Sequence, residues 1–270
     1  MAVRVEKNGA VTTVIHSRSE ARNAMDPASA EALVAAFLAF DADQDAAVAV
    51  FWGEGGAFCA GWDLKSVSSL NQADPVSNID FPKDGGRAPR GPLGPSRLEM
   101  GKPVIAAVEG PAVAGGMELA MWADVRVMAE SAYFGVYCRR WGVPLIDGGT
   151  VRLPRLVGQG RALELIMTGR KVDADECLRI GLCERVVPKG QARQAAEDMA
   201  HEIARFPQAS MRADRRSVYL QHGLSEHAAL EREWTNCTGV FKAEGAAGVA
   251  RFAKGAGRHG DFTHLTLPHH

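Results

Sequence analysis

Two glycine-containing segments follow apolar stretches of this sequence, and their composition is typical of places where backbone amides bind a ligand. Residues 55–65 read GGAFCAGWDLK and follow the apolar stretch AVAVFW at 47–52. A second apolar stretch, PVIAAVEG at 103–110, runs into PAVAGGMELAMWADVRVMAE at 111–130. Ordering a glycine costs more backbone entropy than ordering any other residue. A glycine cluster therefore indicates either a tight turn or a close approach of the backbone to another group.

The second segment combines backbone donors with an acid. Its helix is predicted to begin near Gly115 and Gly116, where free N–H groups and the helix dipole favour negative charge. If N–H groups of both segments converge, they form an oxyanion hole that stabilises the negative oxygen developing on a carbonyl. Glu118 follows Gly115 by three residues, so its carboxylate can reach a carbon next to that carbonyl. The alternative is that Glu118 is an acid placed there only by the helix dipole.

The composition excludes several other classes of protein. The 270 residues are 46% hydrophobic with a net charge of −1, so no overall field recruits nucleic acid or an anionic membrane. The five cysteines form no CxxC pair, and the eight histidines form no i,i+4 pair backed by carboxylates, so no metal is expected. The N-terminus lacks the layout of a signal peptide, and no run of 18 apolar residues occurs. We expect a soluble cytoplasmic protein.

Two common catalytic fingerprints are missing. GGAFCAG does not match the dinucleotide-binding pattern GxGxxG, which argues against a nicotinamide enzyme. The nucleophile elbow GxSxG is also absent, which argues against an α/β-hydrolase serine site.

The elements that must position these segments follow from local patterns. VRVEKNGAVTTVIHS predicts a hairpin around Asn8-Gly9, and DPASAEALVAAFLAFDAD at 26–43 predicts a helix with Pro27 in its first turn. Residues 66–101 are rich in Pro, Gly, Ser and Asn, which predicts a long surface loop with a short helix near 96–101. Asp173 and Glu176 have the spacing of a capping box. Further strands are predicted at 47–52, 103–110, 124–128, 132–136 and 183–188, and helices at 158–169, 173–182 and over most of 190–255.

This order of elements predicts an α/β core followed by a helical extension. We place the core at residues 1–190 and the helical C-terminal region at 191–270. No internal repeat is found.

Four segments resemble a known family. RNAMD at 22–26, GGAFCAGWDLK, KPVIAAVEGPAVAGGMELAMWADVRV and GGTVRLPRLVG at 148–158 resemble the enoyl-CoA hydratase/isomerase, or crotonase, superfamily. The likeness extends over roughly residues 3–255. It implies a spiral of ββα units with a helical C-terminal region that packs into homotrimers, often homohexamers. It also implies an acyl-CoA thioester as substrate, with no cofactor beyond its CoA moiety.

The resemblance assigns the oxyanion hole to the backbone N–H groups of Trp62 and Gly115. The glycines would then leave no side chains at the strand end, so that a thioester oxygen can approach the Trp62 amide. The large Trp62 side chain departs from the small residue often found there, so it is expected to shape the acyl or pantetheine pocket. Segments around Arg22, Ala60, Asp63 and Lys65 match the CoA-binding part of the family. Arg22 and Lys65 either meet CoA phosphates or are solvated surface charges.

The catalytic acids match the family only in part. Glu118 matches one of the two glutamates that family hydratases use, but counting forward without a gap puts Cys138 at the position of the second. Cysteine is a weaker acid and shorter, so the usual pair is incomplete. Asp147, in PLIDGGT, resembles an aspartate that naphthoate synthases carry before the same Gly-Gly, although Asp before Gly-Gly is also an ordinary turn former. Trp141, after Arg139 and Arg140, either lines the acyl pocket or belongs to a surface turn.

The resemblance therefore implies an enzyme that stabilises a thioester enolate. The first hypothesis is an enoyl-CoA hydratase-type lyase that uses Glu118 with Asp147 as partner. The second is a double-bond isomerase that uses Glu118 alone. A third is an Asp147-dependent reaction that forms or cleaves a C–C bond in a ring, and a fourth is a non-catalytic acyl-CoA binder.

Overall fold

The computed structural model describes residues 2–69, 79–84, 86 and 90–257. The chain divides into two compact units, Met1–Ala200 and His201–His270. Within the described residues, every helix is too short or too polar to cross a bilayer.

A mixed sheet forms the centre of the first unit. Its first two strands make the predicted hairpin around Asn8-Gly9, and Gly9 has the positive φ of +57° that such a turn requires. The later strands add in parallel, in the order β1-β2-β3-β4-β6-β9. The strands are β1 (Val3–Asn8), β2 (Val11–His16), β3 (Val48–Gly53), β4 (Val104–Val108), β6 (Val125–Ala129) and β9 (Arg185–Val187).

A second, smaller sheet continues from the end of β4. β5 (Pro111–Val113) pairs in parallel with β7 (Tyr133–Gly135), which pairs antiparallel with β8 (Lys171–Asp173). The strand predicted at 103–110 is confirmed as the single strand β4, and β5 was not predicted, because it forms only where the chain leaves the first sheet and enters the second at Pro111. This change of sheet places the segment before Gly115 beside the segment after β3.

Helices cover both faces of the first sheet. Neighbouring residues of a strand point to opposite faces, and Val14 of β2 belongs to the core under α1 (Pro27–Ala42). The neighbouring residue, Thr13, points to the opposite face of the sheet. There its hydroxyl donates to the carboxylate of Glu197 on α7 (Ala192–Ala204) at 2.8 Å. In α1, Phe37 packs edge-on against Phe51 of β3, with 5.5 Å between ring centroids. The predicted helix start is confirmed, since Asp26 accepts the N–H of Ser29.

Two of the remaining helices of this unit, α3 and α6, pack against the second sheet. α3 begins at Gly115 as predicted, and α6 is capped by Asp173, which accepts the Glu176 N–H at 2.8 Å. Nothing in the sequence predicted α4, because Pro154 lies inside it. The helices are α2 (Leu64–Ser69), α3 (Gly115–Trp122), α4 (Gly149–Val157), α5 (Gln159–Thr168) and α6 (Ala174–Ile180), with 3₁₀ turns η3 (Pro95–Arg97) and η4 (Tyr137–Trp141).

The stretch 91–100 differs from the predicted surface loop. Leu93 and Ser96 are fully buried, and Met100 is nearly so. The helix predicted near 96–101 is wrong, because the backbone becomes extended at Leu98 after the short turn η3. Residues 70–78, 85 and 87–89 of the predicted loop lie outside the described residues.

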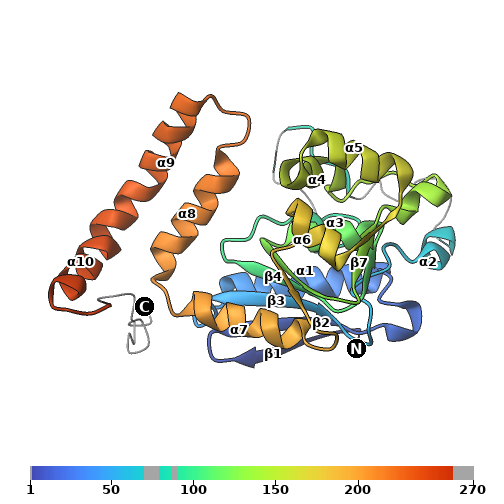
Figure 1. The fold of residues 1–270 in the computed structure, drawn as a ribbon, viewed down its shortest axis with the longest axis horizontal. Helices are drawn as coiled ribbons and strands as arrows, with labels where there is room; N and C mark the ends of the chain where they lie inside the picture. Colours follow the sequence, from blue (N-terminus) through green and yellow to red (C-terminus); the bar gives the residue numbers. More distant parts are fainter. Residues whose placement is uncertain (1, 70–78, 85, 87–89, 258–270) are drawn as a thin grey trace. The chain divides into compact units, whose positions relative to one another are not determined.

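The second unit is a set of C-terminal helices, coloured orange to red in Figure 1. α8 (Gln208–Leu220) and α9 (Glu226–Val240) lie side by side, joined by Asn236, whose side-chain amide donates to the Ala213 carbonyl and the Ser217 hydroxyl, each at 2.7 Å. A π-helical turn, Phe241–Gly245, continues α9 into α10 (Ala246–Ala253). The helical region predicted from residue 191 begins with α7, most of which belongs to the first unit.

Candidate active site

The two glycine-containing segments lie against each other. The Cys59 carbonyl accepts the Val113 N–H at 3.0 Å, which pairs the end of the β3 segment with β5. Gly61 has a φ of +87°, and a Cβ on it would lie 3.0 Å from the Ala114 Cβ and 3.1 Å from the Gly115 nitrogen. Only a residue without a side chain fits there without displacing its neighbours. This close contact brings Trp62 and Gly115 to the same place.

The start of α3 is equally constrained. Ala114 has φ 53° and ψ −127°, a backbone conformation that L-residues rarely adopt and that costs roughly 1–3 kcal/mol. A Cβ on Gly116 would lie 2.0 Å from the Cys59 carbonyl oxygen. The tight packing thus fixes the direction of the Gly115 N–H at the first position of the helix.

The direction of the Trp62 amide is set from the other side. The Gly61 carbonyl accepts the Met25 N–H at 2.7 Å, and the Asp63 N–H donates to the Met25 carbonyl at 2.9 Å. Carbonyl and N–H point in opposite directions across a trans peptide, so the Trp62 N–H points away from Met25. Within the described part of the chain, neither this N–H nor that of Gly115 has a protein acceptor. Both residues line one cavity of about 90 Å³.

Glu118 lies in the wall of this cavity and is only 3% exposed. Its Oε1 accepts the N–H of Asp147 at 2.9 Å and that of Gly149 at 2.8 Å. Burial, together with the charge of Asp147, raises the pKa of Glu118 to about 7. A carboxyl with this pKa is present in both protonation states near neutral pH, so it can accept a proton and return it.

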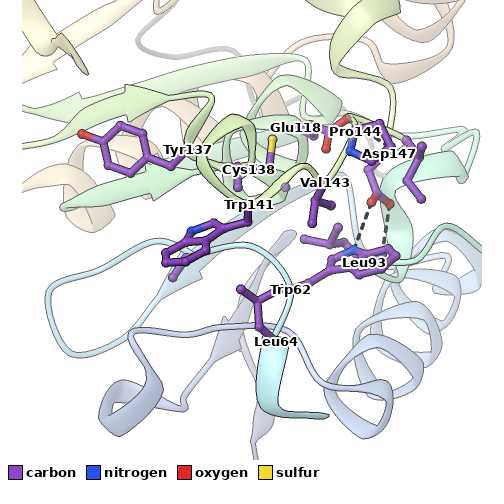
Figure 2. Close-up of a pocket in the computed structure, with 14 residues that line it drawn as sticks. Trp62, Leu64, Leu93, Glu118, Tyr137, Cys138, Trp141, Val143, Pro144 and Asp147 are labelled. Carbon is purple, nitrogen blue, oxygen red and sulfur yellow. Dashed lines mark hydrogen bonds between the residues drawn. The ribbon is translucent and has the colours of Figure 1, made fainter. Parts of the chain in front are cut away.

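Asp147 is the second carboxylate of the cavity wall and is 1% exposed. Its Oδ1 accepts the Leu93 N–H at 3.0 Å and the Ser96 hydroxyl, and its Oδ2 accepts the indole N–H of Trp62 at 3.4 Å. Figure 2 shows this carboxylate pointing at the indole, with dashed lines for the bonds to Trp62 and Leu93. Burial raises the pKa of Asp147.

Cys138 and Trp141 lie on η4, and both line the cavity. Cys138 is 7% exposed, and burial and the nearby Glu118 raise its pKa, so its thiol is neutral at pH 7. Trp141 is 70% exposed and lies at the mouth, whereas Arg139 and Arg140 do not line the cavity. The cavity is otherwise walled by apolar side chains, among them Leu64, Leu93, Val143, Pro144 and Ile146.

The predicted CoA-binding residues lie on segments next to the cavity. Ala60 lines it, and its N–H donates to the Arg22 carbonyl at 3.1 Å. Asp63 pairs with Arg18 at 3.0 Å and accepts the Lys65 N–H at 3.1 Å, so its side chain holds the start of α2. The Arg18 guanidinium lowers the pKa of Asp63. Arg22 and Lys65 are exposed outside the cavity, and their contact with CoA stays a prediction.

Two polar residues of the site were missed from the sequence. Ser96 donates to Asp147, and Arg152 donates to the carbonyls of Asp147 at 2.9 Å and Ser96 at 2.7 Å. Ser96 lies in a Pro- and Gly-rich stretch whose composition indicates only turns, and Arg152 follows Gly148-Gly149 without a recognisable motif. Within the described residues, no group of three or more His, Cys, Asp or Glu side chains could hold a metal ion.

Together these groups can polarise a carbonyl oxygen and move a proton beside it. Two residues whose N–H groups have no protein acceptor in the described part of the chain line the cavity, and Glu118, a carboxyl with a pKa of about 7, lines it as well. The apolar walls strengthen both effects by excluding water.

Comparisons with known proteins agree with this site and fold. A family model described as enoyl-CoA hydratase/isomerase matches residues 6–256. The chain is 36% identical over 234 residues to enoyl-CoA hydratase EchA19 of Mycobacterium tuberculosis, covering 84% of each. It is 36% identical over 204 residues to the carnitinyl-CoA dehydratase of Salmonella typhi, covering 75% of this chain and 74% of the relative.

A solved structure extends the likeness to the whole fold. Enoyl-CoA hydratase EchA1 from Mycobacterium marinum matches with a TM-score of 0.84 and 30% identity, covering 94% of this chain and 96% of that one. The mixed α/β core and the helical C-terminal region are therefore those of the crotonase fold. The chain belongs to the enoyl-CoA hydratase/isomerase family of the crotonase superfamily.

Proposed function

We propose that this protein is an acyl-CoA lyase of the enoyl-CoA hydratase type, which adds water to a 2-enoyl-CoA or removes it from the 3-hydroxy product. The thioester carbonyl lies between the amides of Trp62 and Gly115, and Glu118 moves the proton. The observation that supports this most is a buried Glu118 with a pKa of about 7 in the same cavity as two N–H groups without a protein acceptor.

Glu118 performs both proton steps in this proposal. As the carboxylate, it takes a proton from water, whose oxygen bonds to C3 of the enoyl group. The C2–C3 π electrons move toward the thioester oxygen, and the two N–H groups stabilise the resulting enolate. The Glu118 carboxyl then returns the proton to C2, so that one water molecule has been added. Oε1 is held by two amides, and no protein donor reaches Oε2 in the described residues, which leaves that oxygen for the proton.

The names of the relatives support the same reaction class. Hydration is named for EchA19 and dehydration for the carnitinyl-CoA enzyme, and these are one reaction in opposite directions. We further propose a cytoplasmic homotrimer or homohexamer with no organic cofactor other than the CoA of its substrate. The resemblance to the crotonase superfamily supports these points.

The test follows the absorbance of the conjugated thioester in 2-enoyl-CoA substrates of increasing chain length. We expect the absorbance to fall with the wild-type protein, and turnover to drop by about a thousandfold in Glu118→Gln, because general acid–base catalysis contributes on this scale. Glu164→Gln on α5 is the matched control and is expected to turn over normally. Binding of acyl-CoA without any loss of absorbance would overturn the proposal and favour a non-catalytic binder.

Double-bond isomerisation is the second candidate. It needs one carboxyl that moves a proton between C2 and C4, and the neutral thiol of Cys138 at the position of the second family glutamate favours such a one-carboxyl reaction. An isomerase would generate the conjugated absorbance from a 3-enoyl-CoA and would leave a 2-enoyl-CoA unhydrated. A ring-forming or ring-cleaving reaction would instead require Asp147 as a reacting group.

A further inference from the structure

Asp147 joins three parts of the active site. Its backbone N–H donates to Glu118, and its carboxylate accepts the Trp62 indole. The same carboxylate accepts two donors from the buried stretch 91–100, the Leu93 N–H and the Ser96 hydroxyl. These contacts link segments that are 29 to 85 residues apart in the chain. Asp147 is therefore placed to determine where the other groups stand.

The contacts of Asp147 are those of a structural acceptor. Three donors occupy its two oxygens, and its side chain is almost completely shielded from solvent. Glu118 differs, because both of its bonds reach one oxygen only. Three of the roughly four acceptor sites of the Asp147 carboxylate are taken, whereas one oxygen of Glu118 has no protein donor, so Glu118 is the better placed of the two for proton transfer.

The bond to the indole acts on the oxyanion hole. The peptide that carries the Trp62 N–H is held on one side by Met25, through the Gly61 carbonyl. The Trp62 side chain is held on the other side by Asp147. With both anchors the residue is held through its backbone and its side chain, whereas without the indole bond only the backbone bonds to Met25 hold the Trp62 amide, next to the conformationally permissive Gly61 at φ +87°.

We propose that Asp147 is a positioning residue, which holds Trp62 so that its amide points at the thioester oxygen and leaves proton transfer to Glu118. This rests on the proposed function. It assigns Asp147, the expected partner of Glu118, to the oxyanion hole instead of to the proton steps.

Two substitutions separate positioning from proton transfer. Asp147→Asn keeps the size of the side chain, and its amide oxygen can still accept from Leu93 and Ser96, but its NH₂ group faces the indole N–H and the bond to Trp62 is lost. Trp62→Phe removes the indole N–H from the other end and keeps the backbone amide. Trp52→Phe, on β3 and outside the cavity, is the matched control for replacing a tryptophan.

The first measurement is the infrared carbonyl band of bound butyryl-CoA labelled with ¹³C at the thioester carbon. This saturated thioester cannot be hydrated, so its band reports the oxyanion hole without turnover. We expect a shift to lower frequency on the wild-type protein and on Trp52→Phe. The shift should be reduced to a similar extent in Asp147→Asn and Trp62→Phe, and no further in the double variant.

The second measurement is kcat/KM for hydration in the same four variants. Each single variant in the site is expected to lose roughly tenfold to a hundredfold, less than the loss of an oxyanion-hole donor itself, with no added loss in the double variant. If Asp147→Asn loses turnover but keeps the full carbonyl shift, the positioning role is wrong and Asp147 acts as an acid–base group. Losses that multiply in the double variant would overturn it as well.

The two proposals fail in different ways. No carbonyl shift on the wild-type protein would overturn the oxyanion hole and the proposed function together. A shift that persists in Trp62→Phe overturns only the role of Asp147. If Asp147→Asn does not fold, the carbonyl shift in Trp62→Phe is compared with that in Trp52→Phe. A smaller shift in Trp62→Phe alone supports the positioning role, and equal shifts overturn it.

Discussion

The active-site cavity and the surface formed by α5, β8 and α6 use carboxylates in opposite ways. In the cavity, Glu118 and Asp147 are buried and accept only N–H and O–H donors. On the surface, Glu164 and Glu176 both pair with Arg170 at 2.7 Å and remain partly exposed. Burial raises the pKa of both cavity carboxyls, whereas Arg170 lowers the pKa of both surface ones.

The difference shows what a functional carboxyl requires in this fold. A nearby cation keeps a carboxylate charged at every physiological pH, which suits a structural role. Neutral donors hold a buried carboxylate in place without cancelling the cost of burying its charge, so its pKa moves toward neutrality. Glu118 can therefore exchange a proton at pH 7, and Glu164 cannot.

The pH dependence of hydration should reveal this contrast most strongly. Hydration begins with Glu118 as the carboxylate, so we expect kcat/KM to fall roughly tenfold for each pH unit below its pKa of about 7. Asp147, Arg152 and Cys138 are the other charged or titratable groups near it. The measurement is a pH series of initial rates. A profile that stays flat down to about pH 5 would mean that Glu118 does not titrate in the free enzyme as its burial requires.

Removing the charge of Glu118 should stabilise the protein at high pH. Its pKa is about 7 when folded against a model value of 4.5, so the folded protein binds this proton more tightly than the unfolded chain does. Stability is therefore greatest below the unfolded pKa and is lost as the pH rises through 7. Glu118→Gln is expected to gain about 1–3 kcal/mol near pH 8 and little near pH 4, measured by urea unfolding. A loss of stability near pH 8 would show that the two amide donors outweigh the burial of charge.

Substitution of Gly61 should disturb the cavity without touching a carboxylate. Gly61→Ala meets a positive φ of +87° and close contacts with Ala114 and Gly115, so we expect about 1–2 kcal/mol of destabilisation and roughly tenfold lower kcat/KM. Gly158→Ala is the control, because its φ is +81° and no atom lies within 4 Å of the added Cβ. Equal losses of activity in the two variants would mean that backbone strain alone, and not the contact with Gly115, explains the result.

A substitution in the surface cluster of Arg170, Glu164 and Glu176 should have the smallest effect on the free energy of unfolding. Near pH 8 it should destabilise the protein, whereas Glu118→Gln should stabilise it. Glu164→Gln removes a partly exposed partner of Arg170, so we expect a loss below about 1 kcal/mol that shrinks at high salt. Because Arg170 lowers the pKa of Glu164, this contribution is present above the unfolded pKa and is lost on acidification. Urea unfolding at two pH values measures it, and a gain of stability in Glu164→Gln would contradict the comparison.

Local backbone rules made several elements predictable. The hairpin turn at Asn8-Gly9, the cap at Asp173 and the start of α3 at Gly115 each depend on residues within one turn of each other. The buried stretch 91–100 was not predictable in this way. Its glycines and prolines indicate turns, but only contact with Asp147 and α1 decides that Leu93 and Ser96 are buried.

Local patterns in the sequence were enough to place the glycines at the strand ends and Glu118 on the first turn of α3, and the ordered motifs were enough to predict the family. Backbone conformation and helix starts depend on neighbouring residues, which a sequence displays directly. The contact between Asp147 and the indole of Trp62, 85 residues away, and the burial that raises the pKa of Glu118 to about 7 depend instead on the packing of distant segments. Both depend on which distant segments surround a side chain and exclude water from it, and no local pattern contains that information.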